Sequence, residues 1–375
     1  MLRFWTFVFA FTGLSAFGQA VALEPQPLQC SDELFEGKSK YNEEISGIKC
    51  LATSGADNVC YIVADEKKAL QQISINRTGH QSYQCQSGPV LAKKRGLACL
   101  KGKKPERDFE AIAADGRQLF ITGSWGNQRK KHVGRSSERW VLVRQKLSGA
   151  DRLRGDCQAV KRKDLQSFIK GALPALRPFM DAPLQCGGLN IEGLAVQKGK
   201  LFLGLRSPGI IHDGIGLIIE TSADGIFSNK RQARLHRLAF AVNGVAQKGI
   251  GIRGLESLAD GRFLIATGAG GVTMKNLSTK GENRIATQCA AERNSQAGPL
   301  YRNKVFNVPR ALWLWTPASG GLKHLGDITG PYQHHKLESI SLLAADKNKL
   351  DVVLAFDGVD NAERSPLATI SIRLD

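Results

Sequence analysis

Five stretches of the chain repeat one pattern. Each has an apolar, a polar, a small and an apolar residue, followed by a short turn and a second apolar run. Two examples are "DFEAIAADGRQLFITGSWG" from Asp108 and "NIEGLAVQKGKLFLGLRSP" from Asn190; the other copies begin at Glu44, Gly254 and Lys336. Two apolar runs that flank a tight turn predict a β-hairpin. The chain is therefore expected to contain one hairpin repeated five times.

Further strand-like runs follow several hairpins, such as "RWVLVRQKL" after the second and "RALWLWTP" after the fourth. Repeated hairpins with third and fourth strands predict an all-β fold, the β-propeller. Five copies predict five blades, the last completed by an N-terminal strand from between Leu28 and Tyr41. A six-bladed propeller with one degenerate blade is the alternative. One helix is predicted, at residues 161–173, in an insertion between Cys157 and Cys186.

The first residues have the pattern of a secretory signal peptide. They contain one Arg, an apolar run from Phe4 to about Phe17, and small residues up to Ala22 before the sequence becomes polar. We expect residues 1–22 to be a signal peptide and residues 23–375 a single propeller domain that is periplasmic or secreted. No later segment approaches the ~20 apolar residues of a membrane-spanning helix.

All eight cysteines follow residue 22. An even number in an exported protein, without paired CxxC spacing, favours disulfides over zinc. The first candidate pairs are Cys50–Cys60, across a hairpin, and Cys157–Cys186, across the helical insertion. The sequence leaves the full connectivity open.

The formal net charge of +18 predicts anionic partners. Export and the lack of a nucleic-acid-binding motif argue against nucleic acid. The expected partner is an anionic small molecule, with an anionic envelope surface as a further candidate.

The polar position of the hairpins predicts a ring of side chains. In a propeller the first strand of each blade lines the central channel, so one such residue per blade is expected at a similar height. The predicted ring consists of Ser46, Glu110, Glu192, Glu256 and Glu338.

Such a ring needs a positive charge, because two unit charges ~4 Å apart repel by about 4 kcal/mol at an effective dielectric constant near 20. Ca²⁺, which binds six to eight oxygen ligands, is the expected cofactor. The alternative is that the acidic residues bind backbone amides or pair with arginine, for which Arg206 and Arg253 are candidates.

Topology brings the ends of the second strands and the loops that enter each blade to the same face. Loops on a rigid scaffold commonly carry function. In an enzyme at this face the metal would polarise a substrate oxygen, Arg206 and Arg253 would neutralise developing charge, and His335 or Asp357 would move a proton.

The motifs "DFEAIA", "NIEGLAV" and "GIRGLES" resemble a family of secreted bacterial proteins catalogued as domain of unknown function 3616, which implies no established activity. The arrangement resembles calcium-activated nucleotidases of the apyrase type. That resemblance implies five blades and a tunnel Ca²⁺ held by serine and glutamate, although the ring predicted here is more acidic. The "EAIA" and "EGLA" hairpins also resemble phytase-associated esterase-like propellers, and calcium-dependent lactonases have a tunnel metal within six blades.

The predicted function is metal-dependent binding of an anionic small molecule, such as a phosphate ester, a phosphoanhydride or a lactone. In an enzymatic version the protein is a metal-dependent hydrolase of that molecule. The alternative is a non-enzymatic ligand-binding or scaffold propeller in the cell envelope.

Overall fold

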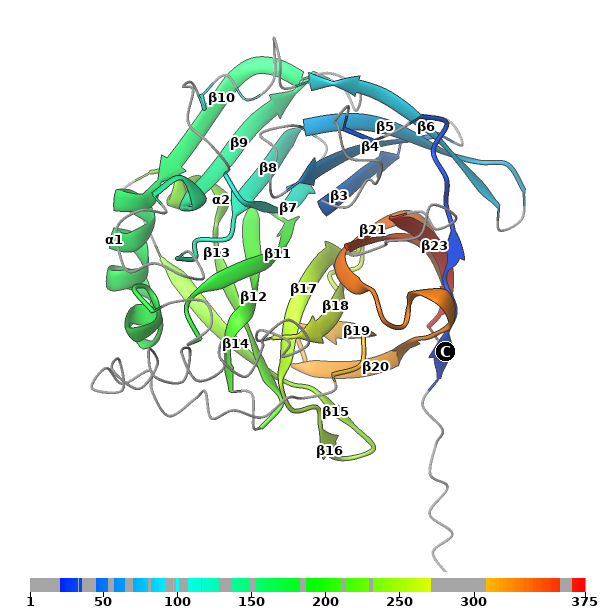
Figure 1. Cartoon of the computed structure of the whole chain (residues 1–375). Helices are drawn as coiled ribbons and strands as arrows, with labels where there is room; N and C mark the ends of the chain where they lie inside the picture. Colours follow the sequence, from blue (N-terminus) through cyan, green and yellow to red (C-terminus); the bar gives the residue numbers. More distant parts are fainter. Residues whose placement is uncertain are drawn as a thin grey trace, which may run out of the picture.

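Five sheets, antiparallel apart from one short N-terminal strand, surround a common axis in the computed structural model (Figure 1). The structure describes residues 21–32, 34–35, 45–52, 57–64, 70–79, 82–91, 97, 99–100, 107–115, 117–127, 137–148, 153–182, 187–210, 213–228, 232–270, 308–357 and 366–374. The chain is a five-bladed β-propeller, as its repeated hairpins predict, rather than the six-bladed alternative.

In each blade, the consecutive strands of the chain follow one another from the central channel to the outer edge. Blade 1 contains β3 (Ile45–Ala52), β4 (Asp57–Ala64), β5 (Leu70–Arg77) and β6 (Tyr83–Val90). Blade 2 contains β7 (Phe109–Ala114), β8 (Gln118–Gly123), β9 (Val141–Leu147) and β10 (Leu153–Lys161). Blade 3 contains β11 (Asn190–Gln197), β12 (Lys200–Ile210), β13 (Ile215–Ser222) and β14 (Ala233–Ala239).

The last two blades each gain a short strand from the N-terminal region. Blade 4 contains β17 (Ile250–Ser257), β18 (Phe263–Ala269), β19 (Ala311–Thr316) and β20 (Gly321–Ile328), with β1 (Ala22–Leu23) parallel to β20. Blade 5 contains β21 (Lys336–Asp346), β22 (Lys349–Asp357) and β23 (Leu367–Arg373), completed by β2 (Gln26–Pro27). A small hairpin, β15 (Ala241–Val242) and β16 (Val245–Ala246), precedes blade 4.

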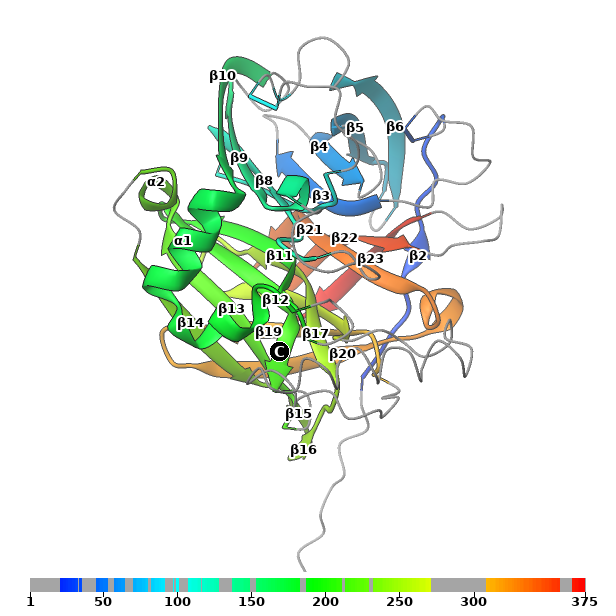
Figure 2. The same cartoon turned by 60° about the vertical axis from the view of Figure 1, so that its left-hand side comes forward.

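The N-terminal segment closes the propeller (Figure 2). An N-terminal strand does complete the last blade, as predicted, but it is Gln26–Pro27 and not a segment from Leu28 to Tyr41. Just beyond it, Cys30 forms a disulfide with Cys85 of β6 in blade 1. The first ten described residues are thus joined to blades 4, 5 and 1.

The inner strands β3, β7, β11, β17 and β21 pack side by side around the axis, and β21 contacts β3 to close the circle. Their close approach explains the small residue of the repeated motif. A Cβ added at Gly254 would lie 3.1 Å from the backbone nitrogen of Ile340, and one at Gly47 would lie 3.1 Å from Cα of Ala111. A larger side chain at this position would therefore push neighbouring blades apart.

The expected helix is present as α1 (Arg162–Ala172), followed by η3 (Pro174–Phe179). Leu165, Phe168 and Ile169 of α1 are buried in a core that also contains Leu142 of β9 and Leu194 of β11. Each of these large apolar side chains contributes roughly 1.5–3 kcal/mol on burial, so α1 is anchored to blades 2 and 3. The other helices in the described ranges are η2 (Ser137–Arg139), α2 (Ala223–Ile226) and η8 (Gly330–Tyr332).

Three disulfides are present in the described ranges. The expected pair Cys50–Cys60 is confirmed. The pair Cys157–Cys186 was a wrong prediction, because Cys157 binds Cys99, which folding brings beside β10. Cys186 and Cys289 lie outside the described residues. None of the described helices has the length and apolar composition needed to span a membrane.

Candidate functional site at the channel mouth

A β-bulge recurs at the same place in the first hairpin of every blade. In each inner strand the pairing register skips one residue, for example between Ile191 and Gly193 of β11. Bulges at the rim of a closed sheet re-aim the extra side chain. The five skipped residues are Ser46, Glu110, Glu192, Arg253 and Glu338. We call these five residues the mouth ring.

The mouth ring corrects one member of the set expected from the sequence. In blade 4 the bulge falls between Ile252 and Gly254, so Arg253 occupies the position that was assigned to Glu256. Glu256 lies three residues further along β17, deeper in the channel. There its carboxylate forms an ion pair with Lys49 of β3 and accepts a hydrogen bond of 3.4 Å from Ser341 of β21.

Three carboxylates of the mouth ring converge. Glu110, Glu192 and Glu338 each offer one carboxylate oxygen, and these three oxygens all lie within 4.8 Å of one another. Glu192 and Glu338 are buried, and Glu110 is partly buried. They come from blades 2, 3 and 5, so only closure of the propeller brings them together. This cluster could hold a metal ion.

Two arginines compensate the charge of Glu192. Arg206 near the end of β12 donates to one carboxylate oxygen at 2.7 Å, and Arg253 donates to the other at 2.7 Å. Arg253 also lies 3.3 Å from a carboxylate oxygen of Glu338. Pairing with Arg206 and Arg253, which was the alternative to a metal in the sequence prediction, therefore occurs. Arg253 links blades 3, 4 and 5 through this contact.

Lys336, two residues before Glu338 in β21, supplies a third positive charge. Its ammonium forms ion pairs with the Glu338 carboxylate and, at 2.9 Å, with Asp357 at the end of β22. The corresponding positions in blades 2 and 3 are Asp108 and Asn190, both of which line the same small cavity. In blades 2, 3 and 5, the residue two positions before the bulge therefore lines the cavity at the channel mouth.

The environment moves the pKa values of two neighbouring carboxyls in opposite directions. Burial by itself would raise the pKa of Glu192, but the Arg206 and Arg253 guanidiniums outweigh it and lower the pKa to about 2. Burial raises the pKa of Glu338 above its usual range, and the charge of Glu192 adds to this, although Lys336 and Arg253 oppose it. Of these two carboxyls, Glu192 is therefore the firmly ionised one.

A cavity of about 40 Å³ opens beside the carboxylates; its lining includes Glu110, Glu192, Asn127, Arg206 and Lys336. It exceeds the ~10–15 Å³ that one water needs but is far below the ~300 Å³ of a small-molecule pocket. The side-chain oxygens of Asn127 and Asn190 are buried and accept no hydrogen bond. The cavity therefore suits an ion, a few waters or one small anionic group.

The remaining predicted site residues lie at different places. The Ser46 hydroxyl donates to the main-chain oxygen of Phe109, which fastens β3 to β7. Asp357 reaches the mouth through Lys336. The His335 ring is buried against Tyr332, which stacks on Phe356 in the core. Of the proposed catalytic residues, Arg206 and Arg253 contact the carboxylate cluster directly.

The sequence prediction missed Lys336, Asn127 and Asn190 at the mouth. The sequence does contain a signal that places Arg253 in the ring. When "GIRGLES" and "NIEGLAV" are aligned on their shared glycine, Gly254 and Gly193, Arg253 falls at the position of Glu192. Asn127 carries no such signal. Its amide donates to the main-chain oxygen of Met180 at 3.1 Å, so the insertion after α1 holds it in place.

The expected resemblance to a family of unknown function is confirmed for part of the chain: the family model described as "Protein of unknown function (DUF3616)" matches residues 150–309. None of the curated proteins matches the sequence.

Similar solved structures include several carbohydrate-active enzymes. An α-L-arabinofuranosidase from Podospora anserina in complex with cellotriose is 9% identical, with 94% of this chain and 96% of that chain covered and a TM-score of 0.40. An α-L-arabinanase from Penicillium chrysogenum complexed with arabinobiose is 9% identical, with coverage of 95% and 98% and a TM-score of 0.36. A GH93 α-L-arabinofuranosidase of Fusarium graminearum with arabinobiose is 6% identical, with coverage of 93% and 98% and a TM-score of 0.42.

Proposed function

We propose that the channel mouth binds one cation, with Ca²⁺ as the best fit, and uses it to bind an anionic small molecule. The observation that carries this proposal is the convergence of Glu110, Glu192 and Glu338 to within 4.8 Å. Oxygens on opposite sides of Ca²⁺ are about 4.6–5.2 Å apart, since each lies 2.3–2.6 Å from the ion. Mg²⁺ usually keeps several waters and is seldom held by a set of fixed protein oxygens, which favours Ca²⁺.

The charge balance also supports a cation. Glu110, Glu192, Glu338 and Asp357 are opposed by the positive charges of Arg206, Arg253 and Lys336. When all seven are ionised, one negative charge is in excess. The unpartnered oxygens of Asn127 and Asn190 line the same cavity and add neutral oxygen ligands of the kind that Ca²⁺ accepts.

An anionic group of the ligand would enter the cavity while the rest of the molecule stays at the surface, because about 40 Å³ admits no more. Arg206 and Lys336 line the cavity and would orient a phosphate or carboxylate by charge. A bound cation would supply Lewis-acid polarisation of a substrate oxygen. This extends the proposal to hydrolysis of a phosphate ester, a phosphoanhydride or a lactone.

A second candidate is a non-enzymatic propeller in which the mouth is a structural ion-pair network. The observation that favours it is the position of Arg253, which contacts both Glu192 and Glu338. In this version the network fastens blades 3, 4 and 5 together and no ion is required.

Calcium titration by calorimetry and thermal unfolding with and without a chelator test the cation. Wild type is expected to bind one Ca²⁺ and to unfold at a higher temperature with it, since 100-fold excess over Kd contributes about 2.7 kcal/mol. Glu110→Gln should weaken binding at least tenfold. The matched control is Glu220→Gln, which removes a carboxylate bound to Lys200 on the outside of blade 3. A wild type that neither binds Ca²⁺ nor gains stability from it contradicts the proposal and favours the structural network.

A panel of nucleotides, phosphomonoesters, phytate and lactones tests the enzyme. Activity that requires Ca²⁺ and falls in both Glu110→Gln and Arg206→Lys would support hydrolysis at the mouth. If Ca²⁺ binds but wild type and both variants are equally inactive, the protein is a binding propeller.

A further inference from the structure

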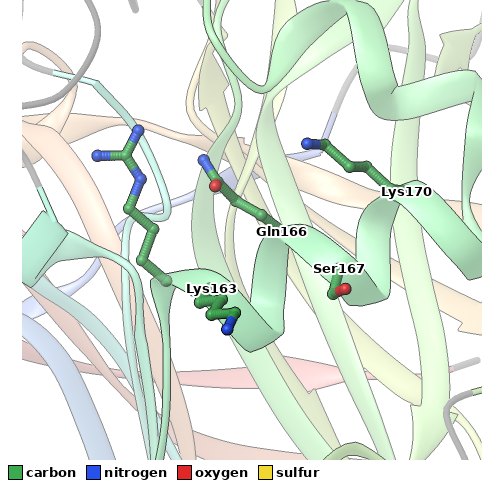
Figure 3. A pocket seen from close by; sticks show the side chains of 5 residues that line it. Lys163, Gln166, Ser167 and Lys170 are labelled. Atoms are coloured by element: carbon green, nitrogen blue, oxygen red, sulfur yellow. The ribbon is translucent and has the colours of Figure 1, made fainter.

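The outer face of α1 is a second site whose chemistry differs from that of the channel mouth. Leu165, Phe168 and Ile169 face the core. On the opposite side, Gln166 and Lys170 extend from one edge of the helix and Lys163 and Ser167 lie along the neighbouring edge (Figure 3). The first turn also carries the exposed acidic residue Asp164, which is not among the residues that line the site. This face is independent of any ion bound at the mouth.

A shallow groove of about 420 Å³ follows this face and is lined by Arg162, Lys163, Gln166, Ser167 and Lys170. Three of the five lining residues are cationic and none is acidic. The groove is therefore suited to a negatively charged ligand.

The spacing of the cations indicates an extended ligand with repeated charges. Lys163 and Lys170 are seven residues apart, which corresponds to about 10.5 Å along the helix axis. Arg177 of η3 extends this row, because its guanidinium donates to the main-chain oxygen of Lys170 at 2.8 Å. A single small anion could contact one end of this row, whereas a linear polyanion could contact all of it.

The uncharged lining residues distinguish between kinds of polyanion. Gln166 and Ser167 lie between the cations and can exchange hydrogen bonds with hydroxyl groups. Among the described residues, the groove lining has no apolar side chain, and the apolar face of α1 is buried in the protein. A helix that inserts into a membrane interface needs an exposed apolar face, so α1 is not expected to insert into a lipid bilayer.

We propose that the α1 groove binds an acidic polysaccharide, a linear chain of sugars whose carboxylates contact Lys163, Lys170 and Arg162 and whose hydroxyls contact Gln166 and Ser167. Binding is electrostatic and weakens with salt, because exposed charges are screened within ~10 Å at 0.1 M ionic strength.

The test uses a hexamer of galacturonic acid as the probe, titrated into the full-length mature protein by calorimetry at two salt concentrations. The double variant Lys163→Gln/Lys170→Gln is expected to bind about tenfold more weakly, as two exposed ion pairs of the usual strength predict. The control double variant Lys248→Gln/Lys347→Gln removes two exposed lysines elsewhere and the same net charge. It should bind like wild type.

Three outcomes would overturn the proposal. The first is equal affinity of wild type and the α1 variant for the hexamer, including the case in which neither binds it. The second is an equal loss in the control variant, which would assign the effect to net charge alone. The third is binding to phosphatidylglycerol vesicles that depends on Lys163 and Lys170 while the hexamer does not bind, which would identify a membrane surface instead. Circular dichroism confirms that each variant is folded.

Discussion

Arg253 is the residue on which the charge balance of the channel mouth depends. It is 3% exposed and contacts two carboxylates that are themselves buried. A buried ion pair adds little to stability when intact, but removal of one partner is costly because the other charge stays buried. The arginine is therefore expected to matter more for stability than a surface arginine with a similar partner.

Substitution Arg253→Gln should lower the free energy of unfolding by about 3–5 kcal/mol. Arg262→Gln, in the same blade, removes a partly exposed arginine that pairs with Asp260 and should cost at most about 1 kcal/mol. Urea unfolding of the metal-free proteins measures both. Similar losses in the two variants would show that Arg253 does not hold the buried carboxylates.

Acid should remove the contribution of Glu192 to stability. Its pKa is lowered to about 2 in the folded protein from an ordinary value of 4.5, so this contribution is complete above pH 4.5 and is lost as the pH falls towards 2. The pH dependence of the Glu338 contribution to stability has the opposite sign. The raised pKa of this carboxyl means that protonation on acidification towards pH 4.5 stabilises the folded state.

The stability difference between wild type and Glu192→Gln, both metal-free, should thus shrink by about 3 kcal/mol as the pH falls from 4.5 to 2. Urea unfolding from about pH 6 to about pH 2 follows this difference, and the part above pH 4.5 also contains the change in the Glu338 pKa that the substitution causes. A difference that grows below pH 4.5 would mean that Glu192 is not an ionised carboxylate in the folded protein.

At the scale of elements, the inner strands carry two layers of polar contacts. The mouth ring forms the first, and Lys49, Glu256 and Ser341 form the second, three residues further along β3, β17 and β21. The pair Lys49–Glu256 joins blades 1 and 4, which are not neighbours in the circle. It therefore ties the blades together across the channel.

A double-mutant cycle tests this cross-channel contact. Lys49→Met and Glu256→Leu should each cost about 3–5 kcal/mol, and the double variant should cost clearly less than their sum, because no unpaired charge remains. The surface pair Lys200–Glu220, treated in the same way, should give a coupling of at most about 1 kcal/mol. Additive losses at Lys49 and Glu256 would exclude a direct pair.

At the scale of the whole molecule, closure depends on residues far apart in the sequence. Strand β2 completes blade 5, and the disulfide Cys30–Cys85 joins the same segment to blade 1 across a sequence separation of 55. The disulfide Cys50–Cys60 spans only 10 residues within one hairpin. A cross-link that closes a longer loop restricts the unfolded chain more.

Replacement of Cys30 and Cys85 by serine should therefore cost about 4 kcal/mol, against about 3 kcal/mol for Cys50 and Cys60. Limited proteolysis should also release the N-terminal segment only in the first variant, because that variant loses the covalent link to blade 1. Thermal unfolding under oxidising conditions measures the two costs. A larger loss of stability on removal of Cys50–Cys60 than on removal of Cys30–Cys85 would contradict this account of closure.

The repeated hairpin was enough to predict the all-β class and the five blades, and the stretch at residues 161–173 predicted α1, because periodic apolar residues and turns are local properties of a sequence. It also identified Glu110, Glu192 and Glu338 as neighbours. The error at Glu256 has a physical cause. Its copy of the motif can be aligned on an acidic or on a small residue, and only the bulge in β17 selects Arg253.

The sequence by itself thus determined the repeat and hence the architecture, since each hairpin must bury its apolar faces against the next one. Tertiary structure decided which charges meet. Lys49 and Glu256, Cys99 and Cys157, and Asn127 and the chain after α1 are brought together by closure of the circle and by an insertion. Such contacts depend on distance in space, which a hairpin pattern does not encode.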